Sequence, residues 1–377
     1  MHGKPEQRRS SCGWLSFRSA GARSISANRR RFISGIATAG FSALACSSTG
    51  LFMSIFAQAP VVAKRRLVDV HHHFFPPFYL SENRDRIATS RGGEIDPAWL
   101  SWSPEQAIAA MDKQGVATAV LCLPTPGVWF GDPHAAVQTA RRANEYATDL
   151  AQSHPGRFGL FAAIPLPDTE GSLREIEYAL NVLKADGIGL VTSYDDKWLG
   201  DAVYDPVFEE LNRRNAVVFV HPTTALCCRT LMPDVSPLVV EIPQDTTRAV
   251  TNLLFTGTFA RFKNIHFIFA HAGGSVPMVL GRIHRYAPKN IAAAAPNGIE
   301  YELKRLYYDI AGTVNRPAIA ALTSFVPTTQ IVFGSDNPFV PLAETAEGMM
   351  QLGFSANDLQ RIGRDNAVAL LPRLKVP

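Results

Sequence analysis

The chain has 377 residues, 46% of them hydrophobic and 19% charged, so it can bury one large core and does not have the composition of a disordered protein. Residues 1–63 hold eight Lys and Arg against one Glu, a net charge of +7, and since the whole chain carries +4, the remainder carries −3. A mildly acidic folded part offers no electrostatic basis for nucleic-acid binding.

The first 63 residues resemble an export leader. Residues 28–33 read Asn-Arg-Arg-Arg-Phe-Ile, which is similar to a twin-arginine signal, and an apolar stretch of small residues follows as far as about Ala59. Gly and Ser interrupt this stretch, which favours a signal peptide over a membrane span. We therefore expect cleavage after Ala59 or Ala63, a periplasmic protein, and no stable membrane partner afterwards. An N-terminal membrane anchor is the alternative.

From residue 64 onward, strand-like apolar runs alternate with helix-like amphipathic segments. Most of the runs are continuously apolar, which is typical of strands buried on both faces of a parallel sheet. The eight expected strands cover residues 67–71, 117–122, 158–164, 187–192, 216–221, 265–270, 306–310 and 329–334.

The expected helices lie between these strands. One begins at Ser103, a suitable N-cap residue, with Pro104 in the first helical position. The others cover residues 134–153, 171–185, 205–214, 246–261, 275–287, 315–324 and 341–352, and a C-terminal helix at 366–371 is expected to close the barrel. This alternation predicts an α/β protein with one (β/α)8 barrel domain over residues 64–377. An open doubly wound sheet is the alternative, but no Gly-x-Gly-x-x-Gly follows the first strand to favour a dinucleotide fold.

The first strand ends in Asp69-Val70-His71-His72-His73. Because successive side chains of a strand point to opposite faces, His71 and His73 should point the same way, about 7 Å apart along the backbone. His72 should point the other way. The two aligned imidazoles are half of a metal site.

Three other strands end in residues of the same kind, namely His221, His271 and Asp336. The carboxyl-terminal ends of barrel strands converge on one mouth, so these side chains should meet the first pair. An ionised Asp336 after an apolar run needs a partner, and a cation is the natural one. Three imidazoles and a carboxylate suit Zn²⁺ or another divalent transition metal. The predicted ligands are His71, His73, His221 and Asp336.

His271 is then left over as an acid–base group beside the metal. A role for it as a fifth ligand is the alternative. The cysteines show no regular spacing, which excludes a disulfide framework and a cysteine-based zinc site. Adjacent Cys227 and Cys228 are not expected to bond to each other in an unstrained chain.

The motifs Asp-x-His-x-His, Val-His-Pro, Ala-His-x-Gly-Gly and Gly-Ser-Asp-x-Pro-Phe together resemble those of the amidohydrolase superfamily. Within it, the chain resembles the branch of aminocarboxymuconate-semialdehyde decarboxylase, 6-methylsalicylate decarboxylase and γ-resorcylate decarboxylase, over residues 66–372. The resemblance implies a metal-dependent hydrolase fold with one metal ion, usually Zn²⁺ and in some members Mn²⁺. It also implies the metal role of the four predicted ligands and the acid–base role of His271.

The resemblance further implies that Phe339 lines the substrate pocket and that Arg282 reaches the site of a neighbouring subunit, as in some members of the family, many of which are homodimers. An ordinary surface position is the alternative for Arg282. Dinuclear amidohydrolases carry a carboxylated lysine at the end of strand four. Here that strand ends in Thr192-Ser193 and Lys197 lies well beyond it, which disfavours a two-metal site.

The implied function is decarboxylation of a small aromatic or conjugated carboxylic acid, similar to 6-methylsalicylate or a hydroxybenzoate, with His271 and Asp336 as candidate proton donors. The residues alone indicate only metal-assisted chemistry, so a hydrolase of a lactone, ester or amide is the alternative. A non-catalytic binding protein is disfavoured because it would not need His271. A guanidinium would suit a substrate carboxylate, and an aromatic wall would suit its ring. The candidates, each alternatively a surface or packing residue, are Arg84, Arg86, Arg91, Arg229, Trp99, Trp102, Trp129 and Phe130.

Overall fold

The computed structural model describes residues 66–90, 95–195, 197–229, 231–232 and 234–374. The predicted leader, residues 1–63, and the candidate Arg91 lie outside the described residues. None of the helices in the described part is both long and apolar enough to cross a membrane.

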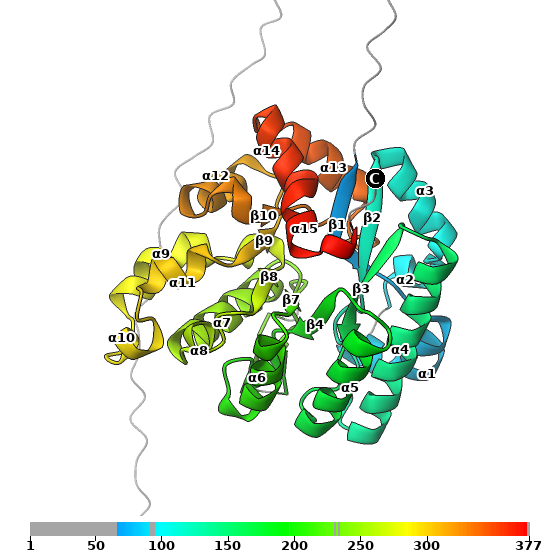
Figure 1. Ribbon diagram of the computed structural model, residues 1–377, viewed down its shortest axis with the longest axis horizontal. Coiled ribbons are helices and arrows are strands. Elements are labelled where there is room, and N and C mark those ends of the chain that lie inside the picture. The colour runs from blue at the N-terminus through cyan, green and yellow to red at the C-terminus, as the bar shows by residue number, and fades with distance from the viewer. Residues whose placement is uncertain (1–65, 91–94, 196, 230, 233, 375–377) are drawn as a thin grey trace, which may run out of the picture. The chain divides into compact units, whose positions relative to one another are not determined.

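Eight parallel strands form the centre of the fold, with helices around them (Figure 1). The strands hydrogen-bond in the order β1-β2-β3-β4-β7-β8-β9-β10. Between the last strand and the first, the Val70 amide donates to the Phe333 carbonyl and the Asp336 amide donates to the His71 carbonyl. These bonds close the sheet, so the predicted (β/α)8 barrel is confirmed against the open sheet. The strands are β1 (Leu67–His73), β2 (Val116–Cys122), β3 (Phe158–Ala163), β4 (Gly187–Val191), β7 (Val217–His221), β8 (His266–Phe269), β9 (Tyr307–Asp309) and β10 (Ile331–Val332).

The main helices agree with the predicted pattern except in two places. The connection after β1, where no helix was predicted before Ser103, contains α1 (Pro77–Ser90) and α2 (Pro97–Ser101). Helix α1 is mostly polar and buries only a few side chains, including Tyr79 and Ile87, so its apolar stripe is too sparse to predict. The helix expected at 246–261 is divided into α7 (Glu241–Phe255) and α8 (Thr258–Arg261), because Gly257 has a φ of +73°.

The remaining helices follow the strands as expected, apart from three short ones that were not predicted, Ile291–Ala294, Ile299–Lys304 and Ala356–Gln360. They are α3 (Pro104–Gln114), α4 (Pro133–Ser153), α5 (Thr169–Asn181), α6 (Asp205–Arg213), α9 (Val276–Arg285), α10 (Ile291–Ala294), α11 (Ile299–Lys304), α12 (Arg316–Phe325), α13 (Leu342–Met350), α14 (Ala356–Gln360) and α15 (Asn366–Leu370). A hairpin of β5 (Ser193–Tyr194) and β6 (Lys197–Trp198) follows β4.

The barrel interior is a separate apolar cluster, distinct from the larger core between strands and helices. Ala367, Leu371 and Leu374 of the C-terminal segment pack against this interior and close its amino-terminal end, as predicted. The strand side chains of the cluster are Val68, Val70, Val120, Cys122, Phe161, Val217, Phe219, Ile268, Ala270 and Val332. The interior is therefore filled with apolar side chains at this end.

Strand β1 contains a β-bulge that simple alternation did not predict. Its pairing with β2 passes from Asp69 directly to His72 while β2 advances by only two residues, so β1 has one residue too many there. The bulge allows Val70 to fill the interior while His71 and His73, one and three positions later, also face inward. Without it, the two histidines would point away from the barrel axis.

Candidate metal centre

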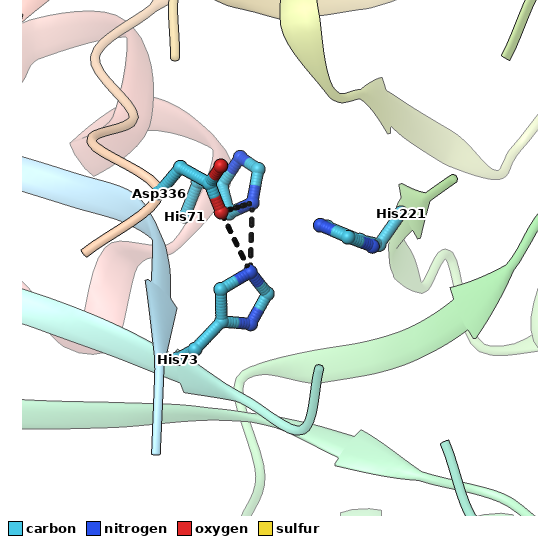
Figure 2. A group of neighbouring side chains, drawn as sticks. All are labelled: His71, His73, His221 and Asp336. Carbon is cyan, nitrogen blue, oxygen red and sulfur yellow. Dashed lines mark hydrogen bonds and ion pairs between the residues drawn. The ribbon is translucent and has the colours of Figure 1, made fainter. Parts of the chain in front are cut away.

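The four predicted ligands meet at the carboxyl-terminal mouth of the barrel (Figure 2). His71 and His73 come from β1, His221 is the last residue of β7, and Asp336 follows β10. All four are buried, and their ligand atoms lie within 4.8 Å of one another. Asp336 Oδ1 is 3.2 Å from His71 Nε2 and 2.9 Å from His73 Nε2, and the two nitrogens are 3.1 Å apart.

Each imidazole is oriented through its Nδ1 atom, which has a fixed acceptor. The pairs are His71 with Asp309 at 2.8 Å, His73 with the Cys122 carbonyl at 3.2 Å, and His221 with the Pro222 carbonyl at 2.8 Å. A proton on Nδ1 leaves the Nε2 lone pair free to bind a metal. Three such lone pairs and a carboxylate around one point are a donor set that fits one divalent cation.

The electrostatics of the cluster agree with this fit. Burial disfavours the charged form of His71, but the Asp309 and Asp336 carboxylates outweigh burial and raise its pKa to about 10. Burial lowers the pKa of His73 to about 4 and that of His221 well below its ordinary value. Burial also opposes ionisation of Asp336, but His71 holds its pKa well below the usual range. Without metal, the cluster therefore holds one proton on His71, which a cation would replace.

Asp309 is a functional residue that the sequence analysis missed. Its Oδ2 atom binds His71 Nδ1, while Oδ1 accepts from the amides of His271 at 2.8 Å and Ala311 at 3.0 Å. Although it lies within 4.8 Å of His71 and His271, both oxygens already have partners, so it orients ligands and is not one itself. A buried carboxylate ending the apolar run of β9 is the same signal that identified Asp336, and it could have found this residue.

Asp69 links the end of β1 to the segment after β10 through hydrogen bonds. Its carboxylate accepts from the amides of His71 and Ser335 and from the Ser335 hydroxyl, at 2.6–3.1 Å. It also binds Nδ1 of His72, whose Nε2 lies 3.2 Å from Asn337. His72 thus points away from the metal site, as predicted, and helps to fix the segment that carries Asp336.

His271 lies beside the cluster, outside the four-ligand set. Its ring centroid is 5.1 Å from that of His71 and 5.8 Å from that of His221. Nδ1 binds the Ala311 carbonyl at 3.0 Å, so Nε2 is the ring atom available for proton transfer. The acid–base role of His271 stays a prediction.

The cluster forms one end of a cavity of about 360 Å³. His221, His271 and Asp336 reach it, and Phe339 stands 5.1 Å from the His73 ring. Behind Phe339, Trp99 is buried and stacks on Phe75. The rest of the lining is Asp96, Leu238, Val239, Ile242, Pro243, Gly274, Gly312, Thr313 and Val340. The pocket is mostly apolar, and among the described residues that line it there is no Lys or Arg.

The candidate arginines lie elsewhere. Arg86 and Arg229 line a neighbouring cavity of about 500 Å³, together with Trp129 and Phe130. Arg84 is exposed on α1. Arg282 is exposed on α9, with its guanidinium 5.1 Å from the Tyr286 ring centroid.

Two other predicted features are located by the structure. Trp102 is only partly buried and packs at the edges of Phe74 and Phe75. At the end of β4, the Thr192 hydroxyl donates to Asp245, and Lys197 is exposed in the β5–β6 hairpin. Strand four therefore presents no lysine to the metal centre.

Residues 68–373 match the family model of the amidohydrolases. The chain belongs to the amidohydrolase family. This amidohydrolase is 34% identical over 329 residues to decarboxylase yanB of Aspergillus niger, a match that covers 82% of this chain and 88% of the relative. It is 32% identical over 321 residues to the 6-methylsalicylic acid decarboxylase of Penicillium expansum, covering 82% and 97%. These relatives confirm the predicted decarboxylase branch and carboxy-lyase class and do not support the hydrolase alternative.

Solved structures of the family have the same barrel. A 2,6-dihydroxybenzoate decarboxylase from Rhizobium superposes with a TM-score of 0.72 at 22% identity, covering 82% of this amidohydrolase and 99% of that chain. A dihydroxybenzoic acid decarboxylase from Polaromonas sp. JS666, with bound manganese and 2-nitroresorcinol, superposes with a TM-score of 0.71 at 22% identity, covering 83% and 98%. At this identity the likeness establishes the fold alone.

Proposed function

We propose that this amidohydrolase is a metal-dependent decarboxylase of a small aromatic acid with a hydroxyl group next to its carboxylate. The observation that carries the proposal is the convergence of three imidazoles and Asp336 at one end of an apolar cavity of about 360 Å³. A cavity of this size and lining suits one substituted benzene ring. The 6-methylsalicylic acid decarboxylase among the relatives acts, by its name, on an acid of this kind.

We propose His71, His73, His221 and Asp336 as the ligands of one divalent ion. Zn²⁺ is our first expectation because imidazole nitrogens dominate the set, and Mn²⁺ is the alternative, supported by the manganese bound in the Polaromonas relative. When bound, the ion acts as a Lewis acid and template for the carboxylate and the adjacent hydroxyl.

The residues of the chain supply the proton. Decarboxylation requires protonation of the ring carbon that bears the carboxylate. The bond to that carboxylate then breaks, CO2 leaves, and the electron pair restores the aromatic ring. His271 Nε2 and Asp336 both reach the cavity and are the two candidate donors. Because the Asp336 carboxyl group is ionised in the cluster, it would first have to accept a proton before it could donate one. Phe339, which lines the cavity 5.1 Å from the His73 ring, is proposed to contact the substrate ring.

In a homodimer, a second subunit could provide the positively charged side chain that the described lining of the pocket lacks. We propose that Arg282 of a second copy binds the substrate, because Arg282 is exposed and the described lining of the pocket has no Lys or Arg of its own. Exposed apolar side chains on α9 and in the segment after β7 support an interface. Met278 is 75% exposed on α9, and Leu238 and Val239, 58% and 68% exposed, also line the pocket.

Mixed dimers test the role of Arg282. Neither Arg282→Ala nor His73→Ala should be active alone, but their co-expression should restore partial activity, because one site per mixed dimer would have both intact ligands and an intact partner arginine. No recovery, with mixed dimers isolated through two different affinity tags, would mean that Arg282 does not act across an interface.

We also propose export through the twin-arginine signal at residues 28–33, with cleavage after Ala59 or Ala63. Cell fractionation and N-terminal sequencing test this directly. Replacing Arg29 and Arg30 with Lys should retain the full-length protein in the cytoplasm. Full-length protein found in the membrane fraction would support the anchor instead.

Metal analysis of leader-free protein, paired with CO2 release from a panel of hydroxybenzoates, tests the function. One metal ion per chain and CO2 release from acids with an adjacent hydroxyl are expected. Benzoates that lack this hydroxyl are the matched control and should react far more slowly. Acid release from esters or lactones without CO2 would overturn the proposal.

A further inference from the structure

The segment after β7 carries two adjacent cysteines that the proposed decarboxylation does not use. Cys227 and Cys228 belong to a single 3-10 turn, Leu226–Cys228, and their Sγ atoms are 2.7 Å apart. Both thiols are free; Cys227 is exposed and Cys228 is buried. The sequence analysis expected no bond between the adjacent cysteines, and the structure places the two free thiols side by side in this tight turn.

The surroundings give the two thiols different properties. The Cys228 amide donates to the Ala225 carbonyl at 2.9 Å, which fixes the turn. The hydrogen bond with Cys227, together with burial, raises the pKa of Cys228 to about 11. Cys228 thus remains a protonated thiol in the resting protein. Since only a thiolate attacks a disulfide and attack requires access, the exposed Cys227 reacts first.

The pair lies on the active face but is separate from the metal cluster. Its chain neighbours Leu226 and Arg229 line the cavity of about 500 Å³ beside the substrate pocket. The other described cysteine, Cys122, is 2% exposed beneath the metal cluster, with Sγ 3.4 Å from His73 Nδ1. Cys122 is thus an internal control that small reagents should not reach in the folded protein.

We propose that Cys227 and Cys228 are a dithiol site that a small-molecule disulfide oxidises to a disulfide between the two residues. The Cys227 thiolate attacks one sulfur of oxidised glutathione, forming a mixed disulfide and releasing one glutathione thiolate. This removes the thiol–thiol hydrogen bond that raised the pKa of Cys228. Cys228, once deprotonated, attacks Cys227 Sγ and releases the second glutathione. Two protons and two electrons leave the protein, and two molecules of reduced glutathione form.

The geometry makes ring closure feasible and reversible. A disulfide requires an S–S distance of about 2.05 Å, so the sulfur atoms need to approach by well under 1 Å. A disulfide between adjacent residues closes a small ring and departs from relaxed geometry, and strained, exposed disulfides are readily reduced. The site is therefore expected to respond to the thiol–disulfide balance of its surroundings.

Mass spectrometry of the folded, metal-loaded protein tests the site. After incubation with oxidised glutathione and alkylation of the remaining thiols, the peptide with Cys227 and Cys228 should lack both alkyl groups and carry no glutathione. Dithiothreitol should restore both alkylation sites. A stable glutathione adduct on the wild-type peptide, or two alkylated cysteines, would overturn the proposal.

Two single variants separate the steps. Cys228→Ser should trap a glutathione adduct on Cys227, because no second thiol is present to displace it. Cys227→Ser should remain unmodified, because Cys228 is buried. Both variants should retain the metal content and turnover of the wild type, which confirms folding. Adduct formation on Cys228 in the second variant would contradict the proposed order of attack.

Discussion

Both ends of the barrel bury charged groups, but these groups have different kinds of hydrogen-bonding partners at the two ends. At the amino-terminal end, the Asp186 side chain is 1% exposed. One of its oxygens accepts from the Leu160 amide at 2.8 Å, and the other accepts from the Arg373 guanidinium at 3.0 and 3.1 Å. Its hydrogen-bonding capacity is used by fixed donors of the protein.

At the carboxyl-terminal end, nitrogen and oxygen atoms of the proposed metal ligands face one another. His71 Nε2, His73 Nε2 and Asp336 Oδ1 are mutually separated by 2.9–3.2 Å, while the Nδ1 atoms are occupied by acceptors behind them. Burial of charge alone therefore does not distinguish a structural ion pair from a metal site. The distinguishing feature is that several possible metal ligands converge on one point and share a single proton, on His71, which a cation can replace.

The largest expected effect on activity comes from removing one of the proposed metal ligands. His73→Ala should lose the metal and reduce kcat/KM by about 1,000-fold or more, since a bound metal contributes several kcal/mol and each 1.4 kcal/mol is tenfold. His72→Gln is the matched control. That side chain is equally buried but points away toward Asp69 and Asn337, so it should keep the metal. Metal content and kcat/KM of both variants test whether His73 is a metal ligand and His72 is not. Equal metal loss in both would contradict the assignment.

The second prediction distinguishes loss of proton transfer from loss of the metal at the same end of the barrel. His271→Gln should lower kcat by about 10²–10⁴-fold, the usual contribution of a positioned acid–base group, while one metal ion per chain remains. The measurements are turnover and metal content of the purified variant. Loss of the metal would show that His271 is a fifth ligand.

The third test measures how metal affinity depends on pH. The pKa of His71 is raised to about 10 in the metal-free cluster, so below that pH a cation must displace a proton. Metal affinity should thus rise about tenfold per pH unit between pH 6 and 8, because one proton is released per metal bound. Competition with a chelator at three pH values measures this. A constant affinity would mean that His71 is already neutral.

The smallest effect on turnover is expected at the amino-terminal end. Asp186→Ala should lower the free energy of unfolding by about 1–3 kcal/mol, because the Leu160 amide loses its acceptor, without changing kcat. Glu170→Ala, at an exposed carboxylate 3.9 Å from Arg174, should change stability by about 0.5 kcal/mol or less. Denaturant melts and turnover of both variants test this. Reduced kcat in folded Asp186→Ala would show that the two ends are coupled.

The sequence by itself determined the barrel and the four proposed ligands. Continuous apolar runs indicate parallel strands, and in a closed barrel their carboxyl-terminal ends must lie at one mouth. His221 and Asp336 could therefore be grouped with His71 and His73 although up to 265 residues separate them, as the sequence numbering shows. This inference needs only the order of the strands, which local patterns supply.

The tertiary structure alone decided how the ligands are held. The role of Asp309 depends on a 2.8 Å contact with His71, 238 residues away, and the inward direction of His71 depends on the bulge opposite β2. The positions of Arg86 and Arg229 in the neighbouring cavity depend on how the loops pack. Periodicity reports which face of an element is apolar. It carries no information on distances between side chains of different elements, and those distances set the chemistry of the mouth.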